Sequence, residues 1–181
     1  MDKKKYLVII ESPAKASSLR SYLGEKYEII ASYGHVRDLP RNYLGVDENA
    51  DFKPSYEILP EKRKTVTQLK KKSKDFSRIY LAADPDREGE AICWHLSQIL
   101  ERKGVEFSRL RFNAITRDSV LNSLKKPSII DMQLVDAQQA RRVMDRLVGY
   151  KVSSWLQRIM GKGKSAGRVQ SVALRIIQER E

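Results

Sequence analysis

The chain has 181 residues, and its 35 Lys and Arg against 23 Asp and Glu give a formal net charge of +12. This length is enough to bury one sizeable core, with a second, smaller unit beside it. The charge attracts polyanions, so nucleic acid is the first partner to consider. A ribosome-associated protein or one that binds anionic membranes would have the same excess of basic residues. The positions of the charges along the chain have to distinguish these partners.

Cysteine usage and hydropathy exclude several classes of protein. Cys93 is the only cysteine, which argues against a disulfide framework or a cysteine-rich zinc site and fits a reducing cytosol. The apolar run near the amino terminus is too short for a signal peptide and meets Glu11 without a small-residue cleavage site. No apolar stretch approaches the roughly 20 residues that span a bilayer. We therefore expect a soluble, cytoplasmic protein.

The first half of the chain alternates strand-like and helix-like segments. The continuous β-branched and aromatic run at 6–10 is typical of a strand covered on both faces, and Pro13 suits the first turn of a helix that stops at Gly24. A second extended segment is expected at 27–32. It is followed by a strand at 78–84 with a helix at 91–100, and by a strand at 109–115 with a helix from Thr116 to about Pro127. The alternation predicts an open, mostly parallel α/β sheet with helices on both faces over residues 1–126.

Two segments between these elements have a different character. Residues 34–60 are rich in glycine, proline and turn formers, which predicts a long loop that is either functional or disordered. Residues 61–74 hold seven Lys or Arg and one Glu around Val66 and Leu69 at helical spacing. We interpret this helix as having a solvated basic face rather than a DNA-contacting patch.

From residue 131 onward no strand-like run appears. Helices are expected at 131–148, 152–160 and 165–181, so we assign residues 127–181 to the beginning of a second, all-helical domain. The last stretch ends without a glycine cap, a proline or a polar tail, and we expect the natural chain to continue.

Acidic residues come directly after two of the predicted strands. Glu11 ends the first strand, and Asp84 ends the strand at 78–84 and is followed by Asp86 and Glu88. In an open α/β sheet ligands bind beyond the carboxyl ends of the strands. Carboxylates held close together repel unless a cation neutralises them, and oxygen ligands without His or Cys favour magnesium. The pattern predicts a magnesium site for phosphoryl chemistry in a basic protein.

A plainer interpretation of the acidic segment remains open, namely a turn whose carboxylates cap the following helix. A nucleotide-binding loop at 161–165 is excluded, because Walker A needs a glycine at position 158, which is Arg158, and a preceding strand. We interpret 161–165 as a basic loop entering a helix at Ser165, whose free backbone N–H groups hold a DNA phosphate.

Six motifs together resemble the amino-terminal region of the bacterial type IA DNA topoisomerases, of the topoisomerase I kind rather than topoisomerase III. They are IIESPAKA at 9–16, SYGHVRDLP at 32–40, DPDREGE at 84–90, FNAIT at 112–116, AQQARRVMDRLVGY at 137–150 and SAGRVQSVALR at 165–175. Glu11 with DPDREGE indicates a Toprim domain, which primases, recombination mediators and some nucleases share. The later motifs narrow the resemblance to type IA topoisomerases, and the start of the chain just before the first strand favours topoisomerase I over reverse gyrase.

This resemblance implies that a tyrosine attacks single-stranded DNA, keeps the 5′-phosphate, allows strand passage and reseals the break. Glu11 would donate or accept the proton at the 3′-oxygen, and Lys15 would position or polarise the phosphate. Magnesium, which the family needs for resealing and relaxation, would be held by Glu11, Asp84, Asp86 and Glu88. The scissile region would be supported by His35 and Arg109, with Arg111 competing for the role of Arg109.

In the helical part, the resemblance implies a groove for single-stranded DNA. Spacing alone gives equal weight to an ion-paired helix face, whereas arginines on phosphate and a planar group on a base would make a strand-binding surface. The family often has tryptophan where this chain has Gln157, and Trp155 lies two residues earlier. The expected groove residues are Arg141, Arg142, Asp145, Arg146, Tyr150, Gln157, Ser165, Ala166, Gly167, Arg168, Val169 and Gln170.

The nucleophilic tyrosine of the family lies in a downstream domain, and none of the eight tyrosines here falls in its motif. We therefore expect a monomeric chain that needs the remainder of its parent, negatively supercoiled DNA and magnesium to relax DNA, and that is inactive alone. Two alternatives stay open: a non-catalytic nucleic-acid-binding Toprim module, and a Toprim nuclease that uses metal and carboxylates without a tyrosine.

Overall fold

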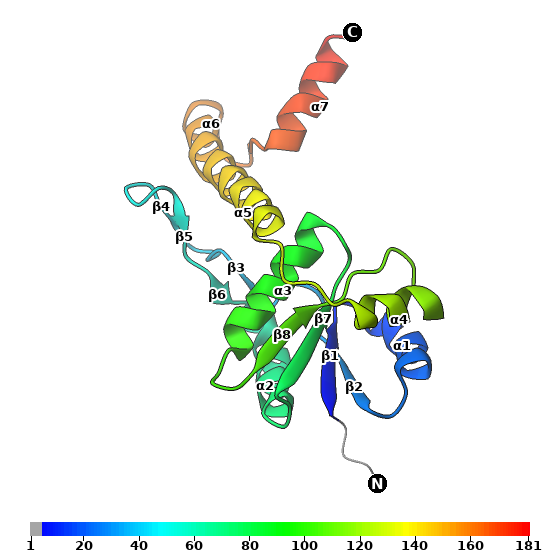
Figure 1. Cartoon of the computed structure of the whole chain (residues 1–181). Coiled ribbons are helices and arrows are strands. Elements are labelled where there is room, and N and C mark those ends of the chain that lie inside the picture. The colour runs from blue at the N-terminus through cyan, green and yellow to red at the C-terminus, as the bar shows by residue number, and fades with distance from the viewer. Residues whose placement is uncertain (1–4) are drawn as a thin grey trace. The chain divides into compact units, whose positions relative to one another are not determined.

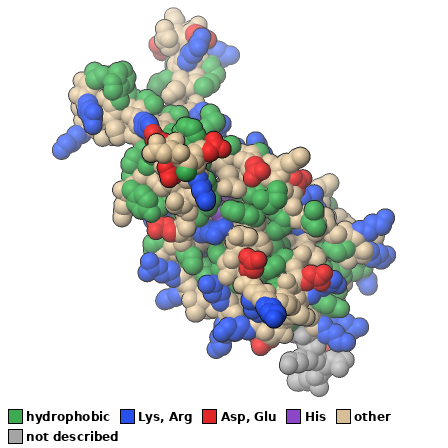
Figure 2. Space-filling model, turned by 60° about the vertical axis from the view of Figure 1, so that its left-hand side comes forward, with side chains coloured by type: hydrophobic (Ala, Val, Ile, Leu, Met, Phe, Trp, Pro, Cys, Tyr) green, Lys and Arg blue, Asp and Glu red, His purple; other side chains and the backbone are tan. Residues whose placement is uncertain are grey.

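The computed structural model describes residues 5–181, which form two compact units. The first unit comprises the residues up to Asp38 together with Glu57–Gln138. The second comprises Leu39–Tyr56 together with Gln139–Glu181, so it takes in a segment from the long loop of the first half. Basic side chains are spread over the face drawn in Figure 2 and do not gather in one patch.

A four-stranded parallel sheet forms the centre of the first unit, in the order β2-β1-β7-β8. Its strands are β1 (Tyr6–Ile10), β2 (Tyr27–Ala31), β7 (Arg78–Ala82) and β8 (Glu106–Arg109). The chain moves from β1 to β2 on one side and then returns to β7 on the other side of β1. This reversal creates a switch point between β1 and β7, where open α/β sheets bind their ligands.

Helices cover both faces of this sheet, as Figure 1 shows. Helices α1 (Ala16–Leu23) and α4 (Arg117–Lys125) pack on the face that carries Val8 and Ile10. The opposite face, with Leu7 and Ile9, is covered by α2 (Arg63–Ser73) and α3 (Arg87–Leu100). Alternate side chains of β1 thus enter two cores, which explains its continuous apolar sequence. The predicted α/β fold, with a mostly parallel sheet and helices on both faces, is confirmed.

The sequence misplaces one strand and misses several short ones. The strand expected at 109–115 instead ends at Arg109, because β7 ends at Ala82 and leaves no partner beyond that level. Residues 34–60 contain two small antiparallel ladders and are not simply a loop. These pair β3 (Arg37–Asp38) with β6 (Glu57–Ile58), and β4 (Val46–Asp47) with β5 (Lys53–Pro54); short 3-10 turns lie at Pro13–Lys15 and Pro60–Lys62.

The rest of the chain is helical, as expected. Helix α5 (Met132–Leu147) runs through a π-helical turn (Val148–Val152) into α6 (Ser153–Met160), so the expected break before residue 152 is absent. Helix α7 (Arg168–Gln178) begins three residues later than predicted, with Gly167 as its N-cap. Among the residues described, no helix is both long and apolar enough to cross a membrane.

We predict that Ile9→Ala lowers the free energy of unfolding by about 2–5 kcal/mol, because Ile9 is 1% exposed at the centre of the sheet and its truncation leaves a cavity. Ile129→Ala removes the same atoms from a side chain that is 84% exposed, and should change stability by no more than about 0.5 kcal/mol. Urea unfolding of both variants checks this. Equal losses would contradict the assigned core.

Candidate catalytic and metal-binding site

The acidic residues singled out by the sequence lie around the switch point of the sheet. Glu11 directly follows β1, and Asp84 lies just beyond the end of the neighbouring β7, whose last residue pairs with Ile10. Asp86 is the N-cap of α3, and Glu88 lies in the first turn of that helix. The side chains of Asp84 and Glu88 are 54% and 57% exposed, so this edge of the sheet is open to a substrate.

Each carboxylate beyond β7 has its own protein partner. Asp84 forms an ion pair with Lys15, and Asp86 accepts a hydrogen bond from the Gly89 N–H at 2.7 Å. Glu88 lies 2.6 Å from His35 Nε2 and also accepts a 3.3 Å hydrogen bond from Gln138. The plainer interpretation of the segment, helix capping, thus holds for Asp86, whereas Asp84 and Glu88 each face a basic side chain.

The four predicted metal ligands fit magnesium in their chemistry, since all are carboxylates and magnesium prefers oxygen ligands. Their arrangement is less complete. Within residues 5–181, no three side chains of His, Cys, Asp or Glu come together closely enough to hold an ion. The ligand set therefore stays a prediction, and binding would require the Asp84 and Glu88 carboxylates to turn from their present partners.

A turn with an unusual backbone carries His35 to this edge. Tyr33 has a φ of 59°, in the left-handed region that few residues other than glycine adopt, and Gly34 follows with a φ of 83°. The Gly34 N–H donates to the carbonyl of Glu11 at 3.2 Å, and Lys62 donates to the carbonyl of Tyr33. The turn after β2 is thereby tied to the end of β1, which brings His35 to Glu88.

Behind His35, a buried histidine packs with an arginine and a tryptophan. His95 is 2% exposed and accepts a hydrogen bond at Nδ1 from Arg37, whose guanidinium lies 4.9 Å from the centre of the Trp94 ring. The His35 and His95 rings lie 6.1 Å apart. Burial, followed by the charges of Arg37 and His35, lowers the pKa of His95 to about 3. His95 is therefore a neutral acceptor at physiological pH.

Arg109 is fully buried and holds the backbone of the acidic turn. Its Nε donates to Glu90 at 2.9 Å, and its Nη2 donates to the carbonyl of Asp84 at 2.7 Å. Nη1 donates to the carbonyls of Leu81 and Leu110. All three guanidinium nitrogens therefore donate to acceptors within the protein, and the hydrogen bond to the Asp84 carbonyl holds the backbone of Asp84 in place.

Glu90 is the centre of this buried network. It is 0% exposed and accepts hydrogen bonds from Arg109, from Arg111 at 2.8 Å and from the Asp131 N–H at 2.8 Å. Burial alone would raise the pKa of the Glu90 carboxyl, but the hydrogen bonds from Arg111, the Asp131 N–H and Arg109 outweigh it and leave that pKa below its usual value. Glu90 is therefore charged, and it joins α3 to β8 and to the chain entering α5.

Close backbone packing adds a second constraint on the acidic turn. A Cβ atom on Gly89 would come within 2.1 Å of the Asp84 carbonyl oxygen, so only glycine fits there. The glycine of the DPDREGE motif thus allows the first turn of α3 to pack directly on the residue that leaves β7.

The arginines predicted to bind DNA lie in the second unit and are engaged there. Arg168 pairs with Asp145 at 2.9 Å, and Arg141 lies 4.0 Å from the same carboxylate. Arg146 donates to the carbonyls of residues 39, 40 and 43, and its guanidinium lies 5.8 Å from the Tyr150 ring centre. The ion-paired helix face is therefore present around Asp145, and DNA binding by these residues stays a prediction.

The loop before α7 is held at two points. The Ser153 hydroxyl accepts from the Ala166 N–H at 3.0 Å and donates to the Ala166 carbonyl at 3.2 Å. Gln157 donates to the Lys164 carbonyl at 3.0 Å. Of the remaining predicted groove residues, Val169 is 72% exposed, and Gly167 packs near the Gln170 side chain. Gln157 thus supports the loop instead of presenting a stacking surface.

Several residues of the site were missed in the sequence, and only one had a recognisable signal. Glu90 lies among the apolar residues of α3, and a charge on a buried helix face requires a partner. The roles of Gln138, His95 and Arg37 depend on contacts between distant segments, which no local pattern indicates.

We predict that Arg109→Leu lowers the free energy of unfolding by about 3–5 kcal/mol, because it leaves part of the Glu90 charge buried without its partner. Arg78→Leu is the matched control, since Arg78 forms a similar pair with Glu106 on the surface and its loss should have little effect. Thermal and urea unfolding measure both. A harmless Arg109→Leu would show that the buried pair is not needed.

His95 should make stability depend on pH. The unfolded chain takes up a proton at this histidine below about pH 6.5, whereas the folded chain does so only near pH 3. The free energy of unfolding therefore falls as pH is lowered through this window, by up to about 1.4 kcal/mol per pH unit from this group. His95→Gln should lose less stability than the wild type between pH 7 and pH 5 in urea titrations. Parallel pH profiles would contradict the buried neutral histidine.

Comparisons with known proteins agree with the fold of this chain. A family model described as "Toprim domain" matches residues 6–115, and one described as "DNA topoisomerase" matches residues 129–181. The chain is also similar to full-length topoisomerase I from Thermotoga maritima, with 42% identity and a TM-score of 0.85. That match covers 96% of this chain and 30% of the relative. The chain therefore belongs to the bacterial type IA DNA topoisomerases and spans less than a third of the length of this relative.

Proposed function

We propose that this chain is the acidic half of the active site of a type IA topoisomerase, which relaxes negatively supercoiled DNA through a 5′-phosphotyrosine. The observation that carries the proposal is the position of Glu11 after β1 and of the 84–88 carboxylates after the neighbouring β7, where Lys15 pairs with Asp84 and His35 with Glu88. In this proposal residues 1–126 form the Toprim domain, and residues 127–181 form the beginning of the helical DNA-binding domain.

The proposed chemistry divides between proton transfer and phosphate binding. Glu11 gives a proton to the leaving 3′-oxygen during cleavage and takes it back during resealing. Lys15 swings from Asp84 to a nonbridging phosphate oxygen, where its charge stabilises the transition state. His35 leaves Glu88 to support the scissile phosphate on the other side. Magnesium, held by Glu11, Asp84, Asp86 and Glu88, would supply positive charge that stabilises the phosphate during resealing.

Arg109 takes a different part in this proposal from the one that the resemblance implies. Because its side chain is 0% exposed and bonded to the Asp84 carbonyl, it acts as a positioning residue for the acidic turn. Arg111, whose side chain is 35% exposed, has the better access to a DNA phosphate.

The second unit provides the strand-binding surface of the proposal. Arg141, Arg142 and Arg168 contact phosphates, and Arg146 with Tyr150 holds a base. When DNA binds, Arg141 and Arg168 exchange the Asp145 carboxylate for a phosphate, so their charges stay paired with an anion. The backbone N–H groups at the start of α7 add a phosphate contact with Gly167 as N-cap. The natural partners are the remainder of the parent chain and single-stranded regions of DNA.

We predict that the chain alone neither cleaves nor relaxes DNA, and that mixing it with the tyrosine-bearing remainder of its parent and magnesium restores relaxation of negatively supercoiled plasmid. Asp84→Asn and Glu11→Gln should each abolish the restored activity. Asp75→Asn makes the same chemical change on an exposed residue before β7, at the opposite edge of the sheet, and should leave relaxation unchanged.

The outcomes of this assay separate the proposed functions. Relaxation that survives Asp84→Asn and Glu11→Gln would refute the acidic half-site. Magnesium-dependent nicking by the chain alone would instead support a nuclease, and its loss in Asp84→Asn would assign that activity to the same carboxylates.

A further inference from the structure

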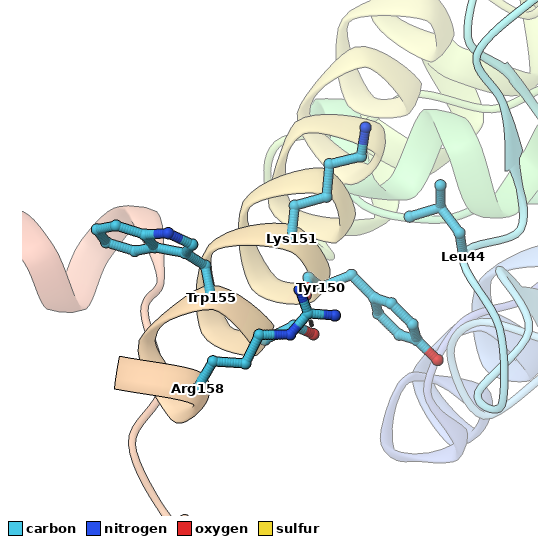
Figure 3. A pocket seen from close by; sticks show the side chains of 6 residues that line it. Leu44, Tyr150, Lys151, Trp155 and Arg158 are labelled. Atoms are coloured by element: carbon cyan, nitrogen blue, oxygen red, sulfur yellow. Dashed lines mark hydrogen bonds between the residues drawn. The ribbon is translucent and has the colours of Figure 1, made fainter. Parts of the chain in front are cut away.

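A pocket in the second unit places Tyr150, to which the proposed function assigns a base, near Trp155 and Arg158, which have no part in that function. It has a volume of about 470 Å³, which lies within the range of small-ligand sites. Its lining comes from one stretch of helix and from the segment opposite it, namely Tyr150, Lys151, Ser154, Trp155, Arg158 and Leu44 (Figure 3). The helical residues lie on successive turns of the π-helical turn and α6.

The pocket presents unusually exposed aromatic rings. Trp155 is 60% exposed and Tyr150 is 37% exposed, although both are residue types that normally bury much of their surface. In Figure 3 the two rings project to different sides of the helix, with Arg158 drawn between them. Such rings offer two separate stacking surfaces flanking a cation, and not a clamp for one flat ligand.

The charges of the pocket favour an anionic ligand. Arg158 is exposed on α6, and Lys151 is paired with Glu48 at 2.6 Å, so that part of its charge is already neutralised. Arg158 therefore provides the main attraction for a phosphate, while the Glu48 carboxylate limits what Lys151 adds.

A side-chain hydrogen bond joins two successive turns of the helix at the pocket. The Ser154 hydroxyl donates to the Tyr150 carbonyl at 2.6 Å, within the stretch where the π-helical turn joins α6. Gln157 donates to the Lys164 carbonyl and supports the following loop. Trp155 is the aromatic residue of α6 and offers its ring for stacking. A π-helical turn of this kind often lies at a functional site, because it redirects the side chains that come after it.

We propose that Trp155 and Arg158 form a further position for single-stranded DNA, in which a base stacks on Trp155 and the phosphate between it and the nucleotide at Tyr150 binds Arg158. The inference rests on the proposed function in that it takes single-stranded DNA as the ligand of this unit. A strand that stacks successive bases on aromatic side chains along a positive track is the general mode of sequence-tolerant binding.

Tryptophan fluorescence tests this position directly, because the chain has only two tryptophans. Trp94→Phe leaves Trp155 as the sole emitter. Titration of this variant with an oligodeoxythymidylate about ten nucleotides long should quench Trp155 emission to saturation. A blunt duplex, whose bases are already stacked, should quench it much less.

Substitutions then measure what the position contributes. Trp155→Ala should weaken binding of the oligonucleotide about 5- to 100-fold, and Trp155→Phe should keep most of the affinity, as expected for a stacking contact. Arg158→Ala should make the dependence of log affinity on log salt concentration less steep, by the amount expected for the loss of about one phosphate contact. Ile159→Ala is the matched control, because Ile159 is 64% exposed on α6 and does not line the pocket.

The results distinguish failure of this inference from failure of the proposed function. Binding of the oligonucleotide with unchanged Trp155 emission and full affinity in Trp155→Ala would overturn the Trp155 position alone. Equal quenching by the duplex would likewise overturn stacking on an unpaired base. Absence of any binding would overturn both the position and the strand-binding role of the second unit.

Discussion

The acidic turn of this protein depends on one buried ion pair. Arg109 and Glu90 are both 0% exposed, and removing charges from water is unfavourable unless they are paired and fully hydrogen-bonded. Glu90 meets this condition with three donors, and Arg109 meets it by donating to the carbonyl of Asp84 as well as to Glu90. Strand β8, helix α3 and the end of β7 are therefore held together at the point where the carboxylates emerge.

At the carboxyl ends of the strands, basic and acidic side chains are paired with one another, and in the proposed reaction each exchanges its present partner for a phosphate or a cation. Lys15 is paired with Asp84 and His35 with Glu88, and the two carboxylates are exposed enough to exchange those partners for a cation. The second unit repeats the arrangement, since the Asp145 carboxylate lies near two arginines that the proposal assigns to DNA. Such pairs lower the cost of holding like charges close together, and they make binding an exchange of partners.

Features set by local patterns were predictable from the sequence, whereas features set by contacts between distant segments were not. The apolar runs of β1 and β7 were recognisable, and Glu11 and Asp84 were placed correctly because each lies at the end of such a run. The burial of Arg109 was not recognisable, since its partner Glu90 lies in another element 19 residues away. The paired strands β3 to β6 are two residues long and have no periodicity to detect. Ser165 resembled a helix start, but the Ser153–Ala166 hydrogen bonds hold that segment out of the helix.

The carboxylates at the β1/β7 switch point are proposed to bind a divalent cation, and paramagnetic NMR tests this most directly. Manganese, a paramagnetic substitute for magnesium, broadens the NMR signals of nearby amides and locates the ion on the intact chain. We expect the amide signals of Glu11 and residues 84–88 to disappear first, and Asp84→Asn to abolish this effect. Selective broadening of the other acidic segment, around Asp47, Glu48 and Asp51, with residues 84–88 unaffected, would contradict the proposed cation site.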